Sequence, residues 1–212
     1  EVFSNTGFGT ERIVDEVRRL FPMARIARLD SDIASRKKEF NMTLFGFENH
    51  DYDILIGTQM IAKGHDFKDV ELAVSLMADK SLSIPNYKAN EDTFDLLTQL
   101  IGRAGRFSNN GKAIIQTYMP ENEIINLSAN QDYEQFYKFE MHNRKVFQYP
   151  PYTFLAIITI SGTDSDELET FCYKVKGYLT AELKNARVNI YGPSFPYIKK
   201  VNNRYYRKLM LK

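Results

Sequence analysis

The sequence QLIGRAGR, residues 99–106, ends an apolar-patterned run at 94–101 and decides how the rest of the chain is interpreted. Two arginines, Arg103 and Arg106, stand three residues apart, each directly after a glycine. If this stretch is helical, residues three apart share a face, so both guanidiniums point the same way. Arginine keeps its charge at any working pH, and its planar fork of donors matches phosphate oxygens. The pattern favours a phosphate-facing pair, and the alternative is a helix end capped by Gly105 with two solvated arginines.

A second motif, GTQMIAKGHDF at residues 57–67, leaves an apolar stretch that is expected to be a buried strand. Hydroxyl and amide groups at such a strand end suit phosphate oxygens of a nucleic-acid strand, a contact that positions without reading sequence. A glycine there lets backbone approach a nucleotide, and an aspartate suits a ribose hydroxyl, although aspartate also fills ordinary turns. The expected nucleic-acid contacts are Thr58, Gln59 and Lys63, and the expected nucleotide contacts are Gly64 and Asp66.

Short apolar runs alternate with helical patterns over residues 1–120, which predicts an α/β fold. Strands are expected at 24–29, 53–58, 70–77 and 112–119. Helices are expected after a cap at Thr10, at 35–47 and, behind a loop that holds Pro85, at 94–101. Such alternation is typical of a parallel sheet covered on both faces, which binds ligands beyond the carboxyl ends of its strands.

The pattern changes after residue 120. Residues 120–146 read as polar helix, Pro150-Pro151 is a stop, and a strand, a helix from Ser165 and two more strands follow. This order predicts a small α+β domain. The expected division is therefore 1–120, a helical connector at 121–149, and a terminal domain at 150–212.

Charge is unevenly distributed along the chain. The 26 residues from Arg187 onward hold seven of the 28 Lys and Arg and none of the 27 Asp and Glu. Basic residues interleaved with aromatic ones suit both backbone charge and base stacking of a nucleic acid. We therefore expect Lys199, Lys200 and Arg204 to bind nucleic acid, and two ordinary strands with solvated lysines are the equally open alternative.

Several expected signatures are missing from the sequence. There is no GxxxxGK[ST] phosphate loop and no identifiable acidic motif for Mg²⁺. The single Cys172 excludes an internal disulfide and a cysteine-based zinc site within this chain. No apolar run reaches membrane-spanning length and no signal peptide is present, and the lone cysteine fits an intracellular, reducing location. The chain also opens without Met and stops in a strand-like run, so we expect a fragment of a longer protein.

The two motifs together with GFGTER at 7–12, RLDSD at 28–32 and YPPY at 149–152 resemble the primosomal protein N′ family, the replication-restart DNA helicases of superfamily 2. Asp79, Pro85, Ala89 and Glu91 fit the same family. The likeness runs nearly from end to end. The sequence departs from the family pattern at four positions, where Asn86, Lys88, Leu100 and Ile101 replace the expected Asp, Arg, Val and Ala.

This resemblance implies a RecA-like second motor lobe followed by the family's small α+β terminal domain. It implies that Arg103 and Arg106 are catalytic toward ATP, that Gln99 bridges the nucleotide and the interface between lobes, and that a missing first lobe completes an ATP and Mg²⁺ site. Zinc is expected upstream of residue 1. The implied partners are single-stranded and forked DNA, primosome and helicase-loading proteins and single-strand-binding protein, in the cytoplasm at the nucleoid and with no membrane.

Two rival functions follow from the same residues. One is a RecA-like adaptor that binds nucleic acid without catalysis, although such a module needs neither paired arginines nor the GHD loop. The other is a metabolic enzyme that binds a phosphorylated small molecule, for which the motif region lacks a general acid, base or nucleophile.

Overall fold

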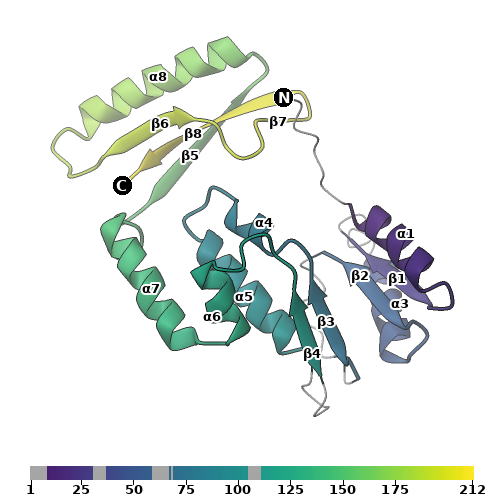
Figure 1. Cartoon of the computed structure of the whole chain (residues 1–212). Coiled ribbons are helices and arrows are strands. Elements are labelled where there is room, and N and C mark those ends of the chain that lie inside the picture. Colours follow the sequence, from purple (N-terminus) through teal and green to yellow (C-terminus); the bar gives the residue numbers. More distant parts are fainter. Residues whose placement is uncertain (1–8, 31–36, 59–66, 68, 105–110) are drawn as a thin grey trace. The chain divides into compact units, whose positions relative to one another are not determined.

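The structure, a computed structural model, describes residues 9–30, 37–58, 67, 69–104 and 111–212 (Figure 1). The chain forms two compact units, one of residues 1–78 and 93–131 and the other of residues 79–92 and 132–212. The units interleave in sequence, and helix α5 (Ala89–Ile101) begins in the second unit and continues in the first. The boundaries expected near residues 120 and 150 stay a prediction.

The first unit alternates helices with short parallel strands. Its elements are α1 (Thr10–Leu20), β1 (Ile26–Leu29), α3 (Lys37–Glu48), β2 (Ile54–Gly57), β3 (Leu72–Ser75), most of α5, β4 (Lys112–Ile115) and α6 (Glu123–Ala129). β1 pairs in parallel with β2, and β3 pairs in parallel with β4. The α/β class with parallel strands is thus confirmed, and the described strands of this unit form two separate pairs.

Helices α1 and α3 cover opposite faces of the β1–β2 pair. Arg28 Nη1 donates to Glu11 Oε1 of α1 at 2.7 Å, whereas the next residue, Leu29, is buried in a cluster with Leu44 of α3. Successive strand residues point to opposite faces, so the two contacts lie on opposite sides of the pair. Phe67 joins the cluster on the α3 side. The predicted covering of both faces is therefore present at this pair.

The second unit is built on an antiparallel sheet. Its elements are α4 (Asp79–Leu82), the start of α5, α7 (Tyr133–Val146), β5 (Ala156–Gly162), α8 (Ser165–Glu182), β6 (Ile190–Ser194), β7 (Lys200–Val201) and β8 (Arg204–Leu211). The strand order is β5–β8–β6, and β7 pairs with one end of β8. α8 lies along one face of the sheet (Figure 1), where Leu168, Cys172 and Leu209 are buried. Burial raises the pKa of the Cys172 thiol.

Local capping explains where the helices begin. Asp164 Oδ1 accepts hydrogen bonds from Asp166 N and Glu167 N, both at 2.9 Å, so α8 starts where the sequence predicts. The helical character expected over 120–146 is present as two helices, because Gln131 has φ of 53° and Asp132 caps a new helix. The expected loop before α5 also contains the four-residue helix α4.

Gly192 is the glycine that the sheet requires. Its φ is +101°, and a Cβ at this position would lie 2.7 Å from Lys208 O in the central strand β8. Gly177 lies in α8, and a Cβ there meets no atom within 4 Å. Alanine is therefore expected to have opposite effects on stability at the two glycines.

Gly192→Ala is expected to lower the free energy of unfolding by roughly 1–3 kcal/mol, because the left-handed backbone and the clash both oppose a side chain. Gly177→Ala is expected to raise it by about 0.4–1 kcal/mol, because alanine restricts the unfolded chain and fits the helix. Urea unfolding of both variants measures the difference. Equal stability of the two variants would contradict this account of β6.

Candidate nucleotide and nucleic-acid interface

The carboxyl ends of β1 and β2 form the edge at which the sequence predicts ligand binding. Leu29 stands opposite Gly57 in the register, and Thr58 N donates to Leu29 O at 3.2 Å. Asp30 and Thr58 therefore leave the two strands at the same edge, and Thr58 is exposed there. The structure places Thr58 where a phosphate contact needs it, and its role stays a prediction. The other predicted contacts of this motif, Gln59, Lys63, Gly64 and Asp66, lie outside the described residues.

Asp30 organises this edge, a role that the sequence reasoning missed. Its side chain is buried and accepts from Thr10 Oγ1 at 3.1 Å, and Arg28 Nε lies 3.1 Å from its Oδ2. Thr10 is the first residue of α1 and Gly9 is the N-cap, so the expectation that Thr10 caps this helix is wrong. The contact fastens the start of α1 beside the carboxyl end of β1. The sequence signal for this role of Asp30 was its place in the RLDSD motif at residues 28–32.

The opposite end of this strand pair is closed by an ion pair. Arg25 Nη2 and Nε donate to Asp53 at 2.7 and 3.1 Å, and Arg25 N donates to the same carboxylate at 2.8 Å. These hydrogen bonds hold the pKa of Asp53 at about 2. Since the folded pKa is lowered, the pairing is complete at neutral pH and is lost only as the pH falls toward 2. The amino-terminal edge is thus occupied by protein groups.

The arginine motif begins where α5 ends. Gln99 is exposed in the last turn of α5, and Gly102 N donates to Thr98 O at 2.9 Å. Arg103 is half-buried and lies in a turn after Ile101, with its N–H donating to Leu100 O at 3.0 Å. The helix ends at Ile101, so Arg103 itself is not helical, and the shared face of the two arginines stays a prediction. Arg106 lies outside the described residues.

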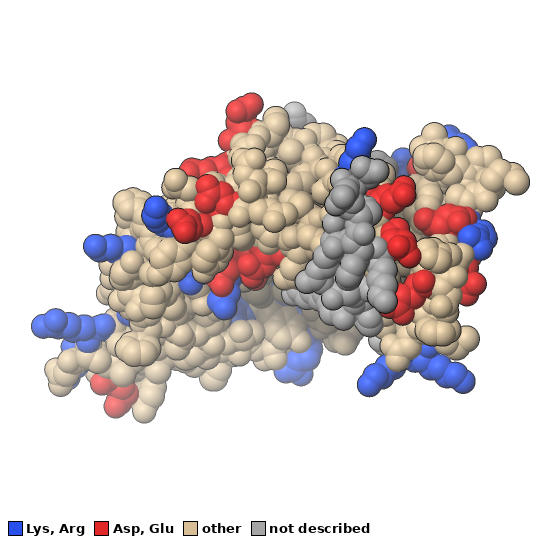
Figure 2. Space-filling view, turned by 90° about the horizontal axis from the view of Figure 1, so that it is seen from below, with Lys and Arg blue, Asp and Glu red and all other residues tan. Residues whose placement is uncertain are grey.

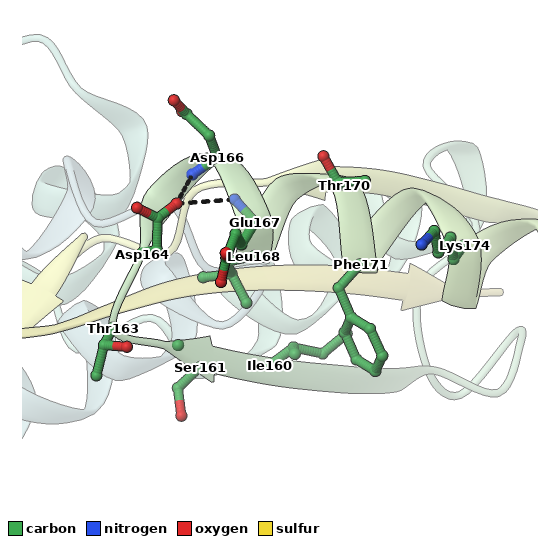
Figure 3. Close-up of a pocket in the computed structure, with 11 residues that line it drawn as sticks. Ile160, Ser161, Thr163, Asp164, Asp166, Glu167, Leu168, Thr170, Phe171 and Lys174 are labelled. Carbon is green, nitrogen blue, oxygen red and sulfur yellow. Dashed lines mark hydrogen bonds between the residues drawn. The ribbon is translucent and has the colours of Figure 1, made fainter.

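The described residues contain no group of three His, Cys, Asp or Glu side chains that is placed to hold a metal ion. A groove of about 680 Å³ lies between β5 and α8 in the second unit (Figure 3). Ile160, Leu168 and Phe171 line it together with Asp164, whose Oδ1 is engaged as the cap of α8. Its lining includes Asp166, Glu167 and Ser161 but neither His nor Cys.

A two-residue hairpin carries the predicted basic residues. Asn202 and Asn203 have φ of 47° and 60°, the backbone that a tight hairpin turn between β7 and β8 needs. Lys199, Lys200 and Arg204 flank this turn and are all exposed. The three cations are therefore gathered at the tip of one hairpin.

These three cations do not share one face of the sheet. Lys200 Nζ lies 4.5 Å from the centroid of the Tyr205 ring, whereas Arg204 Nη2 donates to Ser161 Oγ at 3.1 Å. Neighbouring strand residues 204 and 205 point to opposite faces, so the two cations lie on opposite sides. Lys199 Nζ lies 4.7 Å from the Phe195 ring centroid. An extended nucleic-acid backbone that reaches all three must pass around the hairpin tip.

Two of the seven basic residues in the terminal segment are engaged inside the fold. Arg207 is 3% exposed and its Nη2 pairs with Glu169 Oε2 at 3.2 Å, and Lys212 Nζ donates to Phe147 O at 3.0 Å. The basic surface is thus smaller than the composition suggests. Acidic and basic side chains are interspersed over the described part of the face in Figure 2.

The sheet face opposite α8 also carries aromatic and basic residues that the sequence reasoning did not group. Arg207 and Leu209 are the buried residues of β8, so Tyr206 and Lys208 point to the other face. Tyr191, which is 51% exposed, stands opposite Met210 on that face. The alternation of side chains along the strand-like run 204–211 could have predicted which residues lie on this face.

Two family profiles match the chain. The helicase conserved C-terminal domain matches residues 2–108, and the primosomal protein N C-terminal domain matches residues 145–212. No helix in the described part of the chain has the length and apolar character to cross a bilayer.

Curated relatives agree with the profiles. The chain is 42% identical to the replication restart protein PriA of Bacillus subtilis over 97% of its own length and 26% of that protein. The corresponding protein of Chlamydia trachomatis is 44% identical over 76% of this chain and 21% of that protein, and that of Synechocystis is 34% identical over 97% and 25%. The chain thus spans about a quarter of the length of these relatives. With a helicase domain in its first half and the family's terminal domain in its second, the chain belongs to the replication restart protein PriA family.

Proposed function

We propose that this chain is the second motor lobe and the C-terminal domain of an ATP-dependent DNA helicase that moves 3′ to 5′. The whole protein recognises and remodels stalled replication forks and promotes primosome assembly. The first unit supplies the RecA-like lobe, and the expected domains at 1–120, 121–149 and 150–212 are part of the proposal. The observation that carries the proposal is that the Gly57-Thr58 motif leaves parallel strand β2 at the carboxyl edge of the sheet. Nucleotides and their phosphates bind at this edge in α/β proteins.

The nucleotide side of the proposal depends on the end of α5. Arg103 and Arg106 stabilise the negative charge that develops on the transferring phosphoryl group, and Gln99 links nucleotide to the facing lobe. Gly64 and Asp66 contact the nucleotide. The end of α5 at Ile101 supports this role, because Arg103 follows in a turn and is not held to one face of the helix.

The DNA side has two parts. Thr58, Gln59 and Lys63 hold the backbone of single-stranded DNA at the motor lobe, as groups that position without reading sequence. Lys199, Lys200 and Arg204 at the β7–β8 hairpin contact the arms of forked DNA. The ammonium groups of Lys199 and Lys200 already lie over aromatic rings, which holds their side chains in place and lowers the entropic cost of binding.

ATP and Mg²⁺ are the cofactors of the proposed helicase. The guanidinium, amide and backbone groups of this chain suit the phosphates of the nucleotide. Among the described residues no cluster of carboxylates suits a metal ion, so this chain fits one half of the ATP site. The first lobe supplies the phosphate loop and the Mg²⁺ ligands, and cysteines upstream hold zinc. Further partners are helicase-loading proteins of the primosome and single-strand-binding protein, in the bacterial cytoplasm at the nucleoid.

This chain alone is expected to show no ATPase activity, with or without DNA, because half of the active site is missing. Phosphate release from the purified chain, measured beside the full-length protein, checks the expectation. DNA-stimulated hydrolysis by the chain alone would contradict the half-site.

Arg106→Lys in the full-length protein is expected to lower kcat for ATP by on the order of 10³-fold or more, because lysine keeps charge but lacks the fork of donors. Arg103→Lys is expected to act in the same direction. ATPase rates, DNA affinity and melting temperature of the same variants make the measurement. Normal ATPase in Arg106→Lys would refute the catalytic role, and full-length protein without DNA-stimulated ATPase would indicate a non-catalytic adaptor.

Replacing Lys199, Lys200 and Arg204 together by Gln is expected to weaken binding to forked DNA and to reduce the slope of log affinity against log salt, by up to about one unit for each lost phosphate contact. The matched control replaces Lys138, Lys145 and Lys184 by Gln, three exposed cations elsewhere in the same unit. An unchanged slope in the first triple variant, or an equal change in both, would show that the hairpin is only a solvated surface.

A further inference from the structure

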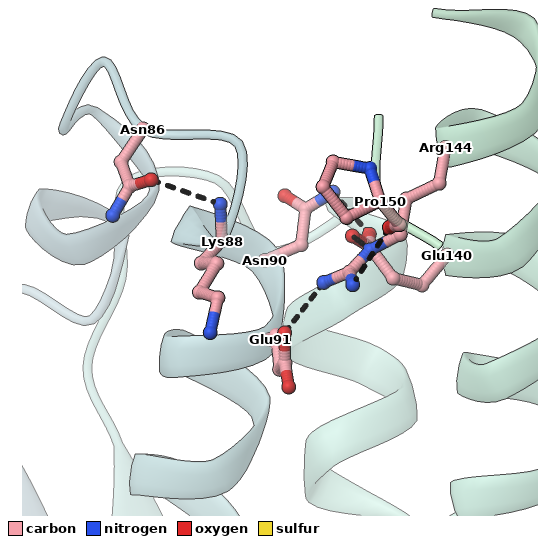
Figure 4. A network of polar contacts seen from close by, with 7 residues as sticks. All are labelled: Asn86, Lys88, Asn90, Glu91, Glu140, Arg144 and Pro150. Carbon is pink, nitrogen blue, oxygen red and sulfur yellow. Dashed lines mark hydrogen bonds and ion pairs between the residues drawn. The ribbon is translucent and has the colours of Figure 1, made fainter. Parts of the chain in front are cut away.

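A single guanidinium in the second unit joins three segments of the chain (Figure 4). Arg144 of α7 donates through Nε to Glu140 Oε1 at 2.8 Å, through Nη2 to Glu91 Oε2 at 2.5 Å, and through Nη1 to Pro150 O at 3.2 Å. The side chain of Arg144 is 14% exposed and that of Glu140 is 8% exposed. Arg144 thus links α7, the first turn of α5 and the turn at Pro150-Pro151.

Additional contacts make this cluster rigid. Asn90 Nδ2 donates to Glu140 Oε2 at 3.1 Å, so the second carboxylate oxygen is also satisfied. The Arg144 guanidinium lies 5.4 Å from the Tyr87 ring centroid, and Tyr87 stacks on Tyr149 at 5.1 Å. Because several hydrogen bonds join the first turn of α5 to α7, this turn has one preferred position relative to α7.

The cluster reaches the end of the C-terminal sheet. Lys212 follows β8, and its Nζ lies 3.5 Å from the Tyr149 ring centroid and donates to Phe147 O. Lys212 and Asn189 also exchange two backbone hydrogen bonds, at 2.9 and 2.7 Å. A continuous set of contacts within the second unit therefore runs from β8, the strand that follows the basic hairpin, to Glu91.

Helix α5 connects this cluster to the arginine motif. Glu91 is the third residue of α5, and the helix runs without interruption to Ile101, two residues before Arg103. Thr93, Phe94 and Leu97 of the same helix are buried. At a rise of about 1.5 Å per residue, a helix of this length is about 20 Å long.

We propose that Arg144 is a positioning residue for the arginine motif: through Glu91 and α5 it couples the DNA-binding C-terminal unit to the helix end that carries Gln99 and Arg103. This inference rests on the proposed helicase function. Its consequence is that DNA bound at the hairpin promotes hydrolysis partly through Arg144, although Arg144 contacts neither DNA nor nucleotide.

The test compares Glu91→Gln, Arg144→Gln and the double variant in the full-length protein. We expect DNA-stimulated kcat to fall about fivefold or more, the lower range of couplings between sites, while DNA affinity, the ATP KM and basal ATPase stay within about twofold. The double variant is expected to be no slower than the slower single variant, because both changes break one contact. Glu91 is the more exposed partner, so Glu91→Gln keeps the test valid if Arg144→Gln folds poorly.

Arg207→Gln is the matched control. Arg207 is buried in the same unit, more deeply than Arg144, and its printed side-chain partners Ser165 and Glu169 belong to α8 rather than to α5 or α7. We expect it to lower the melting temperature without changing the ratio of DNA-stimulated to basal ATPase of the folded protein.

Two results would overturn the coupling. One is an unchanged ratio of DNA-stimulated to basal ATPase in both single variants. The other is a fall in this ratio no larger than that of Arg207→Gln, which would make the Arg144 cluster purely structural. Arg106→Lys in parallel separates the two hypotheses. If Arg106→Lys abolishes ATPase while Glu91→Gln and Arg144→Gln are normal, only the coupling fails. Normal ATPase in Arg106→Lys removes the catalytic role of Arg106, and unchanged full-length protein without DNA-stimulated ATPase removes the proposed function itself.

Discussion

Backbone hydrogen bonding between two parallel strands, β1 and β2, is the constraint on which the candidate site depends. It places Leu29 opposite Gly57, so the chain leaves both strands at one edge. The same register decides which residue faces which helix. A slip of one residue would turn Arg28 into the apolar cluster of α3 and Leu29 toward Glu11 of α1. The core and the ligand edge are thus specified together, and a sequence that satisfies one of them satisfies both.

In the second unit, buried ion pairs reduce the charge that a partner meets. Arg207 is turned toward α8 by the alternation of β8, and its pairing with Glu169 compensates the cost of removing the guanidinium from water. Burial alone would lower the pKa of Arg144, but hydrogen bonds to Glu140 and Glu91 outweigh it and raise that pKa. Arg144 therefore stays charged inside the unit. The exposed cations Lys199, Lys200 and Arg204 are gathered at the hairpin.

Local signals made part of the fold predictable from sequence. The apolar spacing at 94–101 identifies α5, and Asp164 with the apolar pattern after it identifies the start of α8, because helix periodicity and capping act within a few residues. The break at Gln131 was missed, since a left-handed glutamine has no sequence signature comparable to that of glycine. The parallel pairing and the position of Thr58 followed from strand alternation, and the end of α5 at Ile101 agrees with the end expected from the apolar run.

Long-range contacts were beyond the sequence. Glu91 and Arg144 are 53 residues apart, and no periodic pattern connects a carboxylate at the start of one helix to a guanidinium near the end of another. The same holds for Asp30 and Thr10, 20 residues apart, and for the burial of Arg207, which composition counts as surface charge. Counting basic residues therefore overestimates the basic surface, because strand alternation turns Arg207 toward α8.

The environment of Cys172 has a practical consequence for spectroscopy. The thiol is fully buried and its pKa is raised, so little thiolate forms near neutral pH and maleimide reagents react poorly with it. Cys172 is the single cysteine of this chain. A cysteine introduced at Asn203, in the exposed turn between β7 and β8, would therefore take a fluorophore selectively within this chain and report on the hairpin without disturbing the interior.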